Sequence, residues 1–218
     1  MNYKAIIFDM DGTIITTELI WQQATKQLLK NYGNLSDSEC LNMIHSMKGS
    51  SLYTSCSFIK DALKLKQSIN ELILEKQQLA FNNFHNNIQL IDGFDKFHQS
   101  LTNLHMKSAI ATNSNQQSLN EILRYIPLKS FFNEHIYSID IVNKIPKPKP
   151  DIYLYAAQRL KIQPEQCIAI EDSKHGIAAA KAANMYCIGI NTGKDNKALA
   201  QADYIIESYN DINLKTLL

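Results

Sequence analysis

Two kinds of hydrophobic pattern divide this chain. Ala5–Phe8 is a short apolar run rich in β-branched and aromatic residues, and it stops at the polar segment Asp9–Thr13. Such a run is typical of a buried parallel strand that ends in a turn. After residue 88, similar runs alternate with helical patterns, which indicates a parallel sheet with helices on both faces. We expect strands at 5–8, 108–111, 136–137, 167–170 and 186–190, with an edge strand at 203–206.

Residues 16–88 follow a helical pattern instead, and we refer to them as the insert. Ser36 and Ser68 each stand three residues before a glutamate, which is the arrangement of a capping box at a helix start. After Ser68 the apolar residues recur on one face as far as Phe84, with Lys76 among the polar positions, and this predicts a helix of about four to five turns. The usual helix length predicts about four or five helices in the insert.

This arrangement predicts one α/β core interrupted by a helical domain. The core comprises residues 1–15 and 89–218, and the insert, residues 16–88, is the second domain. A chain of 218 residues suits one large domain or one domain with a small attachment, since domains average about 150 residues. The fold class is therefore α/β, with a Rossmann-like parallel sheet flanked by helices and an all-helical insert.

The charge balance and the cysteines exclude several classes of partner. Lysine and arginine together number 22 against 21 acidic residues, so the net charge of +1 creates no strong field for nucleic acid or a membrane. The four cysteines are scattered without a C-x-x-C pair, which indicates neither a disulfide framework nor a zinc site. The first apolar run is too short for a signal peptide or a spanning helix. We expect a cytoplasmic monomer or weak dimer with no nucleic-acid or membrane partner.

Two carboxylates lie at the end of the first predicted strand, in the sequence Asp9-Met-Asp11-Gly-Thr. Open α/β sheets bind ligands at the carboxyl ends of their strands, so location and chemistry agree. The alternative is a solvated turn. The next strand ends in Thr112-Asn113-Ser114 ahead of a helical pattern, where a hydroxyl and free backbone N–H groups can bind an anion. Here the alternative is a helix cap formed by the serine or the asparagine.

A lysine and an acidic pair complete the candidate chemistry. Lys147 lies in the segment Lys-Pro-Lys-Pro-Asp, directly before a helical pattern at 151–160. Glu171 and Asp172 follow the predicted strand at 167–170 and open another helix. Taken alone, Lys147 is consistent with a solvated lysine, and the two acids with favourable charges at a helix start.

In combination, and in this order along the chain, the four segments resemble the haloacid dehalogenase-like superfamily of phosphohydrolases. More narrowly, Lys147–Tyr153 and Ile170–Gly176 are similar to the subgroup that contains phosphoglycolate phosphatases and β-phosphoglucomutases. The resemblance covers essentially the whole chain, and the insert lies where that subgroup carries a helical cap. It implies a Mg²⁺-dependent phosphatase that hydrolyses a small phosphorylated metabolite, a phosphomonoester.

The resemblance also implies a role for each residue of the site. Asp9 would attack phosphorus and form an aspartyl phosphate. Asp11 would protonate the leaving oxygen and then activate water as a base. Lys147 would neutralise charge on the transferred group, while the Thr112 hydroxyl and the Asn113 N–H would hold its oxygens.

A Mg²⁺ ion is implied by the same resemblance, because two acids and a phosphate dianion repel one another without a cation. Its ligands would be the Asp9 carboxylate, the Asp11 backbone carbonyl and Asp172, with Glu171 either a direct ligand or a partner behind the ligands. Gly12 would let the backbone turn sharply beside the phosphate.

Three positions depart from the pattern of the subgroup. Thr16 stands where its members usually have an aspartate, and the mutases have a histidine at the position of Trp21 and an arginine at that of Leu52. A mutase must bind a second phosphate through the cap, so these differences favour hydrolysis to water. The dehalogenase and phosphonate-cleaving relatives lack a counterpart of Asp11. A phosphosugar mutase and a non-catalytic metabolite-binding protein on the same fold stay open as alternatives.

Overall fold

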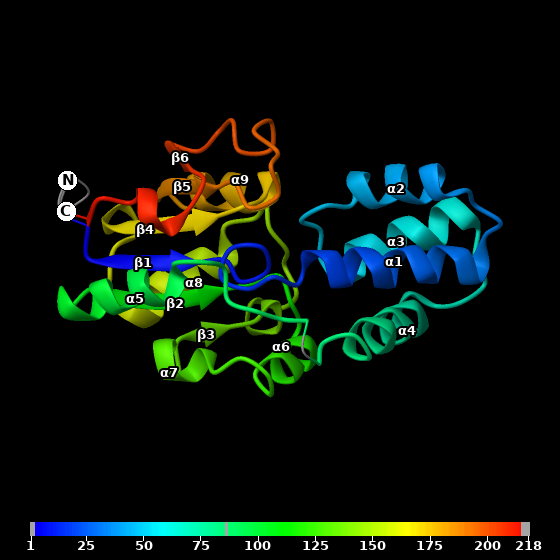
Figure 1. Ribbon diagram of the computed structural model, residues 1–218, viewed down its shortest axis with the longest axis horizontal. Helices are drawn as coiled ribbons and strands as arrows, with labels where there is room; N and C mark the ends of the chain where they lie inside the picture. Colours follow the sequence, from blue (N-terminus) through cyan, green and yellow to red (C-terminus); the bar gives the residue numbers. More distant parts are fainter. Residues whose placement is uncertain (1–2, 86, 215–218) are drawn as a thin grey trace.

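The computed structural model describes residues 3–85 and 87–214. Two lobes lie side by side, the α/β core and the helical insert (Figure 1). In the described part of the chain, no helix combines the length and the apolar character that crossing a membrane requires. All four cysteines are buried as free thiols.

The core is built on one parallel sheet with the strand order β3-β2-β1-β4-β5-β6. Its strands are β1 (Ala5–Phe8), β2 (Lys107–Ala111), β3 (Ile136–Tyr137), β4 (Cys167–Glu171), β5 (Tyr186–Ile190) and β6 (Tyr204–Ile206). Each lies within one residue of its predicted range, and β6 is an edge strand as expected. In the register of the central strands, Phe8 aligns with Ile110 on β2 and Ile170 on β4, so these three strands end at the same edge of the sheet.

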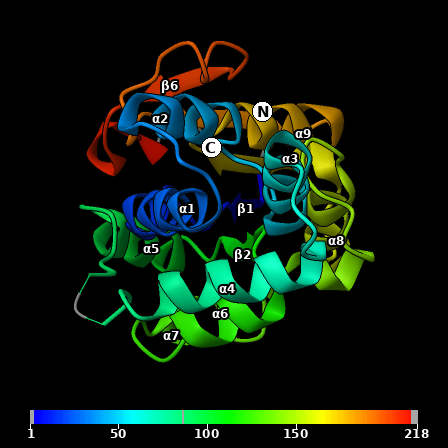
Figure 2. The ribbon, with the colours of Figure 1, turned by 90° about the vertical axis from the view of Figure 1, so that its right-hand side faces the viewer.

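Helices cover both faces of this sheet. They are α5 (Phe94–Asn103), α6 (Gln116–Ile122), α7 (Leu128–Phe132), α8 (Asp151–Leu160) and α9 (Lys174–Ala182). Figure 2 shows α8 and α9 on one side of β1 and β2, with α5 on the other. Two of these helices, α5 and α7, add to the elements predicted from the sequence.

The two faces of the sheet carry side chains of different size. Large residues such as Phe8, Ile110 and Ile170 pack against α5, α6 and α7. On the other face, small residues such as Ala109 and Ala169 pack against α8 and α9. Because successive side chains of a strand point to opposite faces, each short apolar run contributes to both clusters. The predicted α/β class, with a parallel sheet covered on both sides, is confirmed.

The insert folds as helices around an apolar cluster of its own. These helices are α1 (Glu18–Tyr32), α2 (Asp37–Ser46), α3 (Leu52–Leu63) and α4 (Ile69–Phe81). Buried members of the cluster include Leu28, Ile44, Ile59 and Leu72. Both predicted capping boxes are present, at Ser36 before α2 and at Ser68 before α4. The all-helical character of the insert therefore follows from its own start signals and its own core.

Helix α4 differs from the predicted helix in two respects. It ends at Phe81, because residues 82–85 form turns, so it is shorter than expected. Phe84 lies beyond the helix and packs edge-on against Trp21, with 5.8 Å between ring centroids. Lys76, which was expected on the polar face, is buried with 6% of its surface exposed. Its burial results from the packing of α4 against α1 and α3, which the periodicity of one helix does not report.

Two segments of chain join the lobes, and they run beside each other. Ile15 forms an antiparallel bridge with Leu90, and the Thr16 N–H donates to the Gln89 carbonyl at 2.9 Å. Next to this connection, the Gln77 side chain on α4 donates to the Ser118 hydroxyl on α6 at 3.0 Å. The insert is thus joined to the core by backbone pairing and by a polar contact. The exact domain boundaries, at residues 15 and 88, stay predictions.

Candidate active site

The ends of three adjacent strands bring the predicted residues together. Asp9 follows β1, Thr112 follows β2, and Asp172 follows β4. All three are buried, as is Lys147, which reaches the same place from the loop before α8. This is the edge at which parallel sheets with helices on both faces bind ligands.

Lys147 is the centre of a buried ion-pair cluster. Its Nζ lies 2.5 Å from Asp9 Oδ1 and 2.6 Å from Glu171 Oε1. The same ammonium group donates to the Ala111 carbonyl at 2.8 Å. Asn113 fixes the loop, because its side-chain oxygen accepts the backbone N–H of Lys147 at 3.0 Å. The alternative of a solvated lysine is therefore wrong for Lys147.

The charges of this cluster shift one another's pKa. Burial by itself would lower the pKa of Lys147, but the carboxylates of Asp9 and Glu171 outweigh this effect and raise that pKa above its ordinary value. Burial raises the pKa of Asp9 to about 8, although Lys147 acts in the opposite direction. Burial also raises the pKa of Asp172 well above its ordinary value, and Asp9 and Glu171 add to the increase. The cluster holds more negative charge than Lys147 can balance.

The carboxylates predicted to bind a metal meet at one point. One oxygen each from Asp9, Glu171 and Asp172 lies within 4.8 Å of the other two, and all three residues are buried. Hard oxygen donors are the ligands that Mg²⁺ prefers, and a divalent cation would supply the positive charge that Lys147 lacks. The donor set therefore fits such an ion.

Glu171 is held by neighbours on both of its oxygens. Besides Lys147, its Oε1 accepts from the Tyr153 hydroxyl at 2.7 Å, and its Oε2 accepts from the Ser173 hydroxyl at 3.2 Å. Gly176 on α9 leaves room for this carboxylate, since a Cβ there would lie 1.8 Å from Oε1. Tyr153 and Gly176 were not among the predicted site residues. The only signal for them was their position inside the two segments that carry the family resemblance.

Asp11 lies where the two lobes meet. Its carboxylate accepts hydrogen bonds from the hydroxyl of Thr17, just before α1, and from that of Ser114, after β2, at 2.9 Å for the latter. Burial raises the pKa of Asp11, while these two hydrogen bonds lower it. Ser114 was considered as a possible helix cap, but the capping residue of α6 is Asn115. The contact between Ser114 and Asp11 depends on the tertiary fold and has no local sequence signal.

Thr112 and Asn113 stabilise the loop after β2, and each also has a hydrogen-bond donor that can bind a ligand. The Thr112 Oγ1 accepts the backbone N–H of Ser114 at 3.0 Å. Among the described residues, neither the Thr112 hydroxyl nor the backbone N–H of Asn113 has an internal acceptor. Both donors are therefore available to an anion at the edge of the sheet.

Gly12 is required by the close approach of Asp172. Its φ of +84° lies in the region that favours glycine, and a Cβ would come within 2.3 Å of Asp172 Oδ2. The Thr13 hydroxyl donates to the other oxygen of Asp172 at 3.3 Å. The glycine predicted beside the phosphate thus makes room for a predicted metal ligand.

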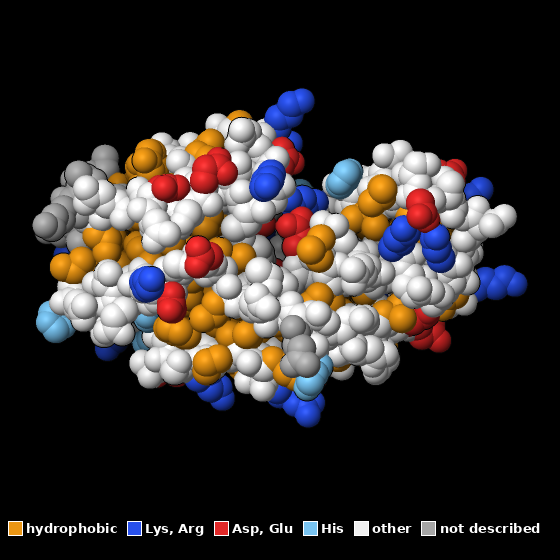
Figure 3. All heavy atoms as spheres, viewed as in Figure 1, with side chains coloured by type: hydrophobic (Ala, Val, Ile, Leu, Met, Phe, Trp, Pro, Cys, Tyr) orange, Lys and Arg blue, Asp and Glu red, His pale blue; other side chains and the backbone are white. Residues whose placement is uncertain are grey.

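A cavity of about 170 Å³ opens onto these residues between the lobes. Its core wall includes Asp9, Asp11, Thr112, Asn113, Lys147 and Asp172. The opposite wall comes from the insert and includes Trp21, Ile44, Lys48, Leu52, Ser55 and Lys76. Figure 3 shows acidic and basic side chains gathered beside the hollow at which the lobes meet. Residues of both lobes therefore line this cavity.

The three positions that depart from the subgroup pattern lie in or near the same junction. The Thr16 hydroxyl accepts the backbone N–H of Gln89 at 3.0 Å, so it strengthens the connection between the lobes. Trp21 lines the cavity and also packs against Phe84. Leu52 presents an apolar residue to the cavity where the mutases have an arginine.

Comparisons with known proteins agree with this geometry. A protein-family model described as haloacid dehalogenase-like hydrolase matches residues 6–190. The phosphorylated carbohydrates phosphatase of Thermotoga maritima is 29% identical over 204 residues, 91% of each chain. The fructose-1-phosphate phosphatase of Escherichia coli is 29% identical over 192 residues, 87% of this chain and 97% of that protein. A solved HAD hydrolase of family IA, variant 3, from Entamoeba histolytica matches with a TM-score of 0.85 and 25% identity, over 97% of this chain and 96% of that one.

Proposed function

The chain belongs to the haloacid dehalogenase-like hydrolases, and on that premise we propose that it hydrolyses a small phosphomonoester metabolite, with Mg²⁺, through an aspartyl phosphate on Asp9. The relatives described above are phosphatases, so the enzyme is a phosphoric monoester hydrolase. One observation carries the mechanism. Asp9, held by Lys147 at 2.5 Å, meets Asp172 and Glu171, and together with Asp172 it lines a cavity between the two lobes.

Asp9 is the residue placed to attack phosphorus. Lys147 holds its Oδ1, which restricts rotation of the carboxylate and leaves Oδ2 as the attacking oxygen. A bond forms between Oδ2 and phosphorus while the bond from phosphorus to the ester oxygen breaks. Lys147 offsets negative charge on the transferred group, and the free donors of Thr112 and Asn113 hold its oxygens.

Asp11 is placed to move the proton. Hydroxyls of Thr17 and Ser114 orient its carboxyl group. In the first step Asp11 gives a proton to the leaving ester oxygen. In the second step it takes a proton from the water that attacks the aspartyl phosphate, which frees Asp9 and releases inorganic phosphate. The same carboxyl group thus acts first as an acid and then as a base, and it ends in its starting state.

The residues that would hold Mg²⁺ are Asp9, Asp172 and the backbone carbonyl of Asp11. Glu171 already accepts hydrogen bonds on both oxygens, so we place it behind these ligands, where it also holds Lys147. When bound, Mg²⁺ supplies the positive charge that lets a phosphate dianion approach these carboxylates.

We further propose that residues 16–88 act as a cap. The cavity has walls from both lobes, and the two connecting segments lie side by side, an arrangement that suits a hinge. Gly93, with a φ of +78°, and the segment Thr16-Thr17 would absorb the rotation. Opening exchanges metabolites, and closure excludes bulk water from the phosphoryl group during transfer.

Phosphate release tests the proposed function directly. We expect turnover of p-nitrophenyl phosphate and of at least one member of a phosphorylated-metabolite panel with Mg²⁺, and loss of turnover with a chelator. Asp9→Asn should lower activity by about 10³-fold or more, because an amide does not attack phosphorus. Asp95→Asn, an exposed site on α5, is the matched control and should leave activity unchanged.

The outcomes of this assay separate the alternatives. Near-native activity of Asp9→Asn would rule out the covalent mechanism. A folded, Mg²⁺-loaded protein that turns over none of the substrates would instead favour the non-catalytic metabolite-binding protein.

Phosphate transfer within a sugar is not expected. The insert wall has Leu52 and Trp21 where the mutases have an arginine and a histidine, so it offers no forked cation for a second phosphate. Formation of glucose 6-phosphate from β-glucose 1-phosphate should therefore be undetectable. Isomerisation at a rate comparable with phosphate release would support the mutase alternative.

The surroundings in which the enzyme works are also part of the proposal. We place it in the cytoplasm as a monomer or weak dimer without nucleic-acid or membrane partners, which its net charge of +1 supports. Light scattering over a range of protein concentrations would test the oligomeric state.

A further inference from the structure

The turn Gly12-Thr13, directly after Asp11, is held by two side chains from the C-terminal part of the core. The Thr192 hydroxyl, in the loop after β5, donates to the Gly12 carbonyl at 2.6 Å. The Tyr209 hydroxyl donates to the Thr13 carbonyl at 2.9 Å. These contacts join residues 180 and 196 positions apart in the sequence. The turn is therefore attached to a part of the chain that carries none of the predicted site residues.

Tyr209 begins the short 3-10 helix η3 (Tyr209–Asp211), and its ring is buried among other aromatic rings. It stacks on Phe97 with 5.2 Å between ring centroids and meets Phe94 edge-on at 5.6 Å. A phenylalanine would make the same ring contacts. The hydroxyl adds a buried donor that needs an acceptor, and the Thr13 carbonyl is that acceptor. The particular contribution of the hydroxyl is thus its hold on the turn.

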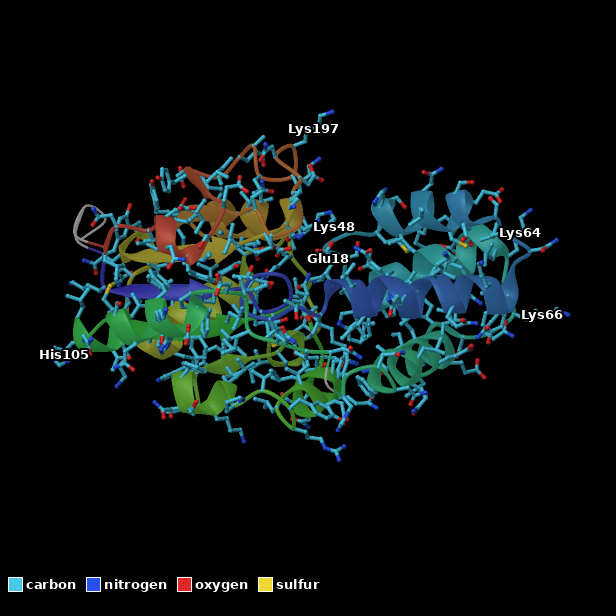
Figure 4. The ribbon with its side chains drawn as sticks, viewed as in Figure 1. Glu18, Lys48, Lys64, Lys66, His105 and Lys197 are labelled. Carbon is cyan, nitrogen blue, oxygen red and sulfur yellow. The ribbon has the colours of Figure 1, made fainter. Side chains whose placement is uncertain are left out.

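Thr192 lies where the core faces the insert. The next residue is Gly193, at which a Cβ would lie 2.5 Å from Lys48 Nζ. Figure 4 shows Lys48 and Glu18 where the two lobes meet. The Thr192 hydroxyl nevertheless contacts the core, at Gly12, so both anchors of the turn belong to the core.

The backbone of the turn does not hold these two carbonyls itself. The N–H groups of residues 12–15 donate to the carbonyls of Met10 and Ile15. The carbonyls of Gly12 and Thr13 accept from side chains instead. A buried carbonyl that loses its donor keeps the cost of its desolvation, so removal of either hydroxyl favours a shift of the turn.

A shift of the turn would disturb the proposed metal ligands. The Thr13 hydroxyl donates to Asp172 Oδ1 at 3.3 Å, and a Cβ at Gly12 would lie 2.3 Å from Asp172 Oδ2. The Asp11 carbonyl, another proposed ligand, belongs to the peptide bond that joins Asp11 to Gly12. The turn thus determines where both of these ligands lie, and groups that orient metal ligands affect the affinity for the metal.

We propose that Tyr209 and Thr192 are positioning residues of the metal site, and that they set its affinity for Mg²⁺ through the turn Gly12-Thr13. The inference rests on the metal site of the proposed function. Neither residue is a ligand, because the hydroxyl of each donates to a carbonyl of the turn. Both act on the ion through Asp172 and the Asp11 carbonyl.

The test measures binding of Mg²⁺ without substrate. The Tm at increasing Mg²⁺ concentrations gives the dissociation constant, since an ion that binds only the folded chain raises the Tm by mass action. Tyr209→Phe and Thr192→Val each remove one hydroxyl and keep the shape of the side chain. The matched controls are Tyr32→Phe in the insert and Thr102→Val in α5, which lose hydroxyl hydrogen bonds away from the site. Thr192 is half-buried, so its variant tests the turn even if Tyr209→Phe does not fold.

We expect the dissociation constant for Mg²⁺ to rise by about tenfold in Tyr209→Phe and in Thr192→Val, the lower end of the losses seen for groups that orient metal ligands. The Mg²⁺ concentration that gives half-maximal phosphate release should rise by the same factor. At saturating Mg²⁺, kcat and the KM for p-nitrophenyl phosphate should match those of the wild type. The two controls should bind Mg²⁺ as the wild type does.

A purely structural role would lower the Tm equally with and without Mg²⁺. The inference is overturned if either folded variant binds Mg²⁺ as tightly as the wild type, if a control loses as much affinity, or if Mg²⁺ does not raise the Tm of the wild type. Phosphate release by the wild type in the last case would leave hydrolysis intact and reject only the metal site. Binding of Mg²⁺ without turnover of any substrate would reject the phosphatase function and leave the inference standing.

Discussion

The two walls of the cavity differ in whether their buried lysine is paired with a carboxylate. In the core wall, Asp9 and Lys147 form a buried network with Glu171 behind them, and each of these three charged groups touches one of opposite sign. The insert wall is mostly neutral, and it buries the ammonium group of Lys76 beside a serine hydroxyl. Lys147 in the core wall is thus paired with carboxylates before any substrate arrives, whereas Lys76 in the insert wall has a neutral partner.

This difference has a structural origin. The core wall is made of strand ends, and the register of β1, β2 and β4 places their carboxyl ends at one edge. The insert wall is made of separate helices, each of which contributes only a few side chains to the cavity. We infer that the strand ends carry the reaction steps common to the family, and that the helices carry recognition of the particular substrate.

Removing the acid from the core wall should have the largest effect. Asp11→Asn should lower kcat by about 10²- to 10⁴-fold, because the amide can neither protonate the leaving oxygen nor activate water. Thr17→Val removes only a hydrogen bond to Asp11 and should cost about tenfold or less. Steady-state phosphate release measures both. Equal losses in the two variants would show that orientation, rather than proton transfer, is the function of Asp11.

Replacement of the two buried lysines by methionine should have different effects on the free energy of unfolding. Lys147→Met leaves Asp9 and Glu171 buried without their cation, so the free energy of unfolding should fall by about 3–5 kcal/mol. Lys76→Met removes an unmatched charge and should not lower it. Urea denaturation without Mg²⁺ measures both variants. A loss below about 1 kcal/mol for Lys147→Met, the size of an exposed pair, would contradict the contrast between the walls.

The smallest expected effect is a change in the free energy of unfolding with pH. It compares a buried histidine of the core with an exposed histidine of the insert. His98 lies in the core among aromatic rings, with its Nε2 3.0 Å from the Ser108 hydroxyl, and burial lowers its pKa to about 4. The unfolded chain binds the proton near pH 6.5 and the folded chain only near pH 4, so stability should fall as the pH drops through this range. His98→Gln keeps a polar group near Ser108 and should lose less stability on acidification.

His45, an exposed residue of the insert, is the matched control for this measurement. His45→Gln should leave the difference in unfolding free energy between pH 7 and pH 5 unchanged. A wild type and a His98→Gln variant with the same acid sensitivity would show that His98 does not contribute to it.

Local patterns in the sequence predicted the framework of the protein. The apolar runs located every strand of the sheet to within one residue, because burial on both faces leaves little freedom in composition. The capping boxes at Ser36 and Ser68 marked two helix starts, since their hydrogen bonds join residues three apart. The positions of Asp9 and Asp172 followed from the strands that precede them. Helix α7, with five residues, is too short for a period to reveal.

Only the tertiary structure decided which polar groups meet. The contacts of Asp11 with Ser114 and of Glu171 with Tyr153 join residues 103 and 18 positions apart, and no local signal encodes them. Lys76 occupies a position that reads as polar in its own helix, yet the packing of α4 against α1 and α3 buries it and places it in the wall of the cavity. The spacing of apolar residues in the sequence indicates only which side chains share one face of a helix. Burial depends on all the surfaces that pack around it, and the energetic cost of burying a charge depends on its neighbours in space rather than in sequence.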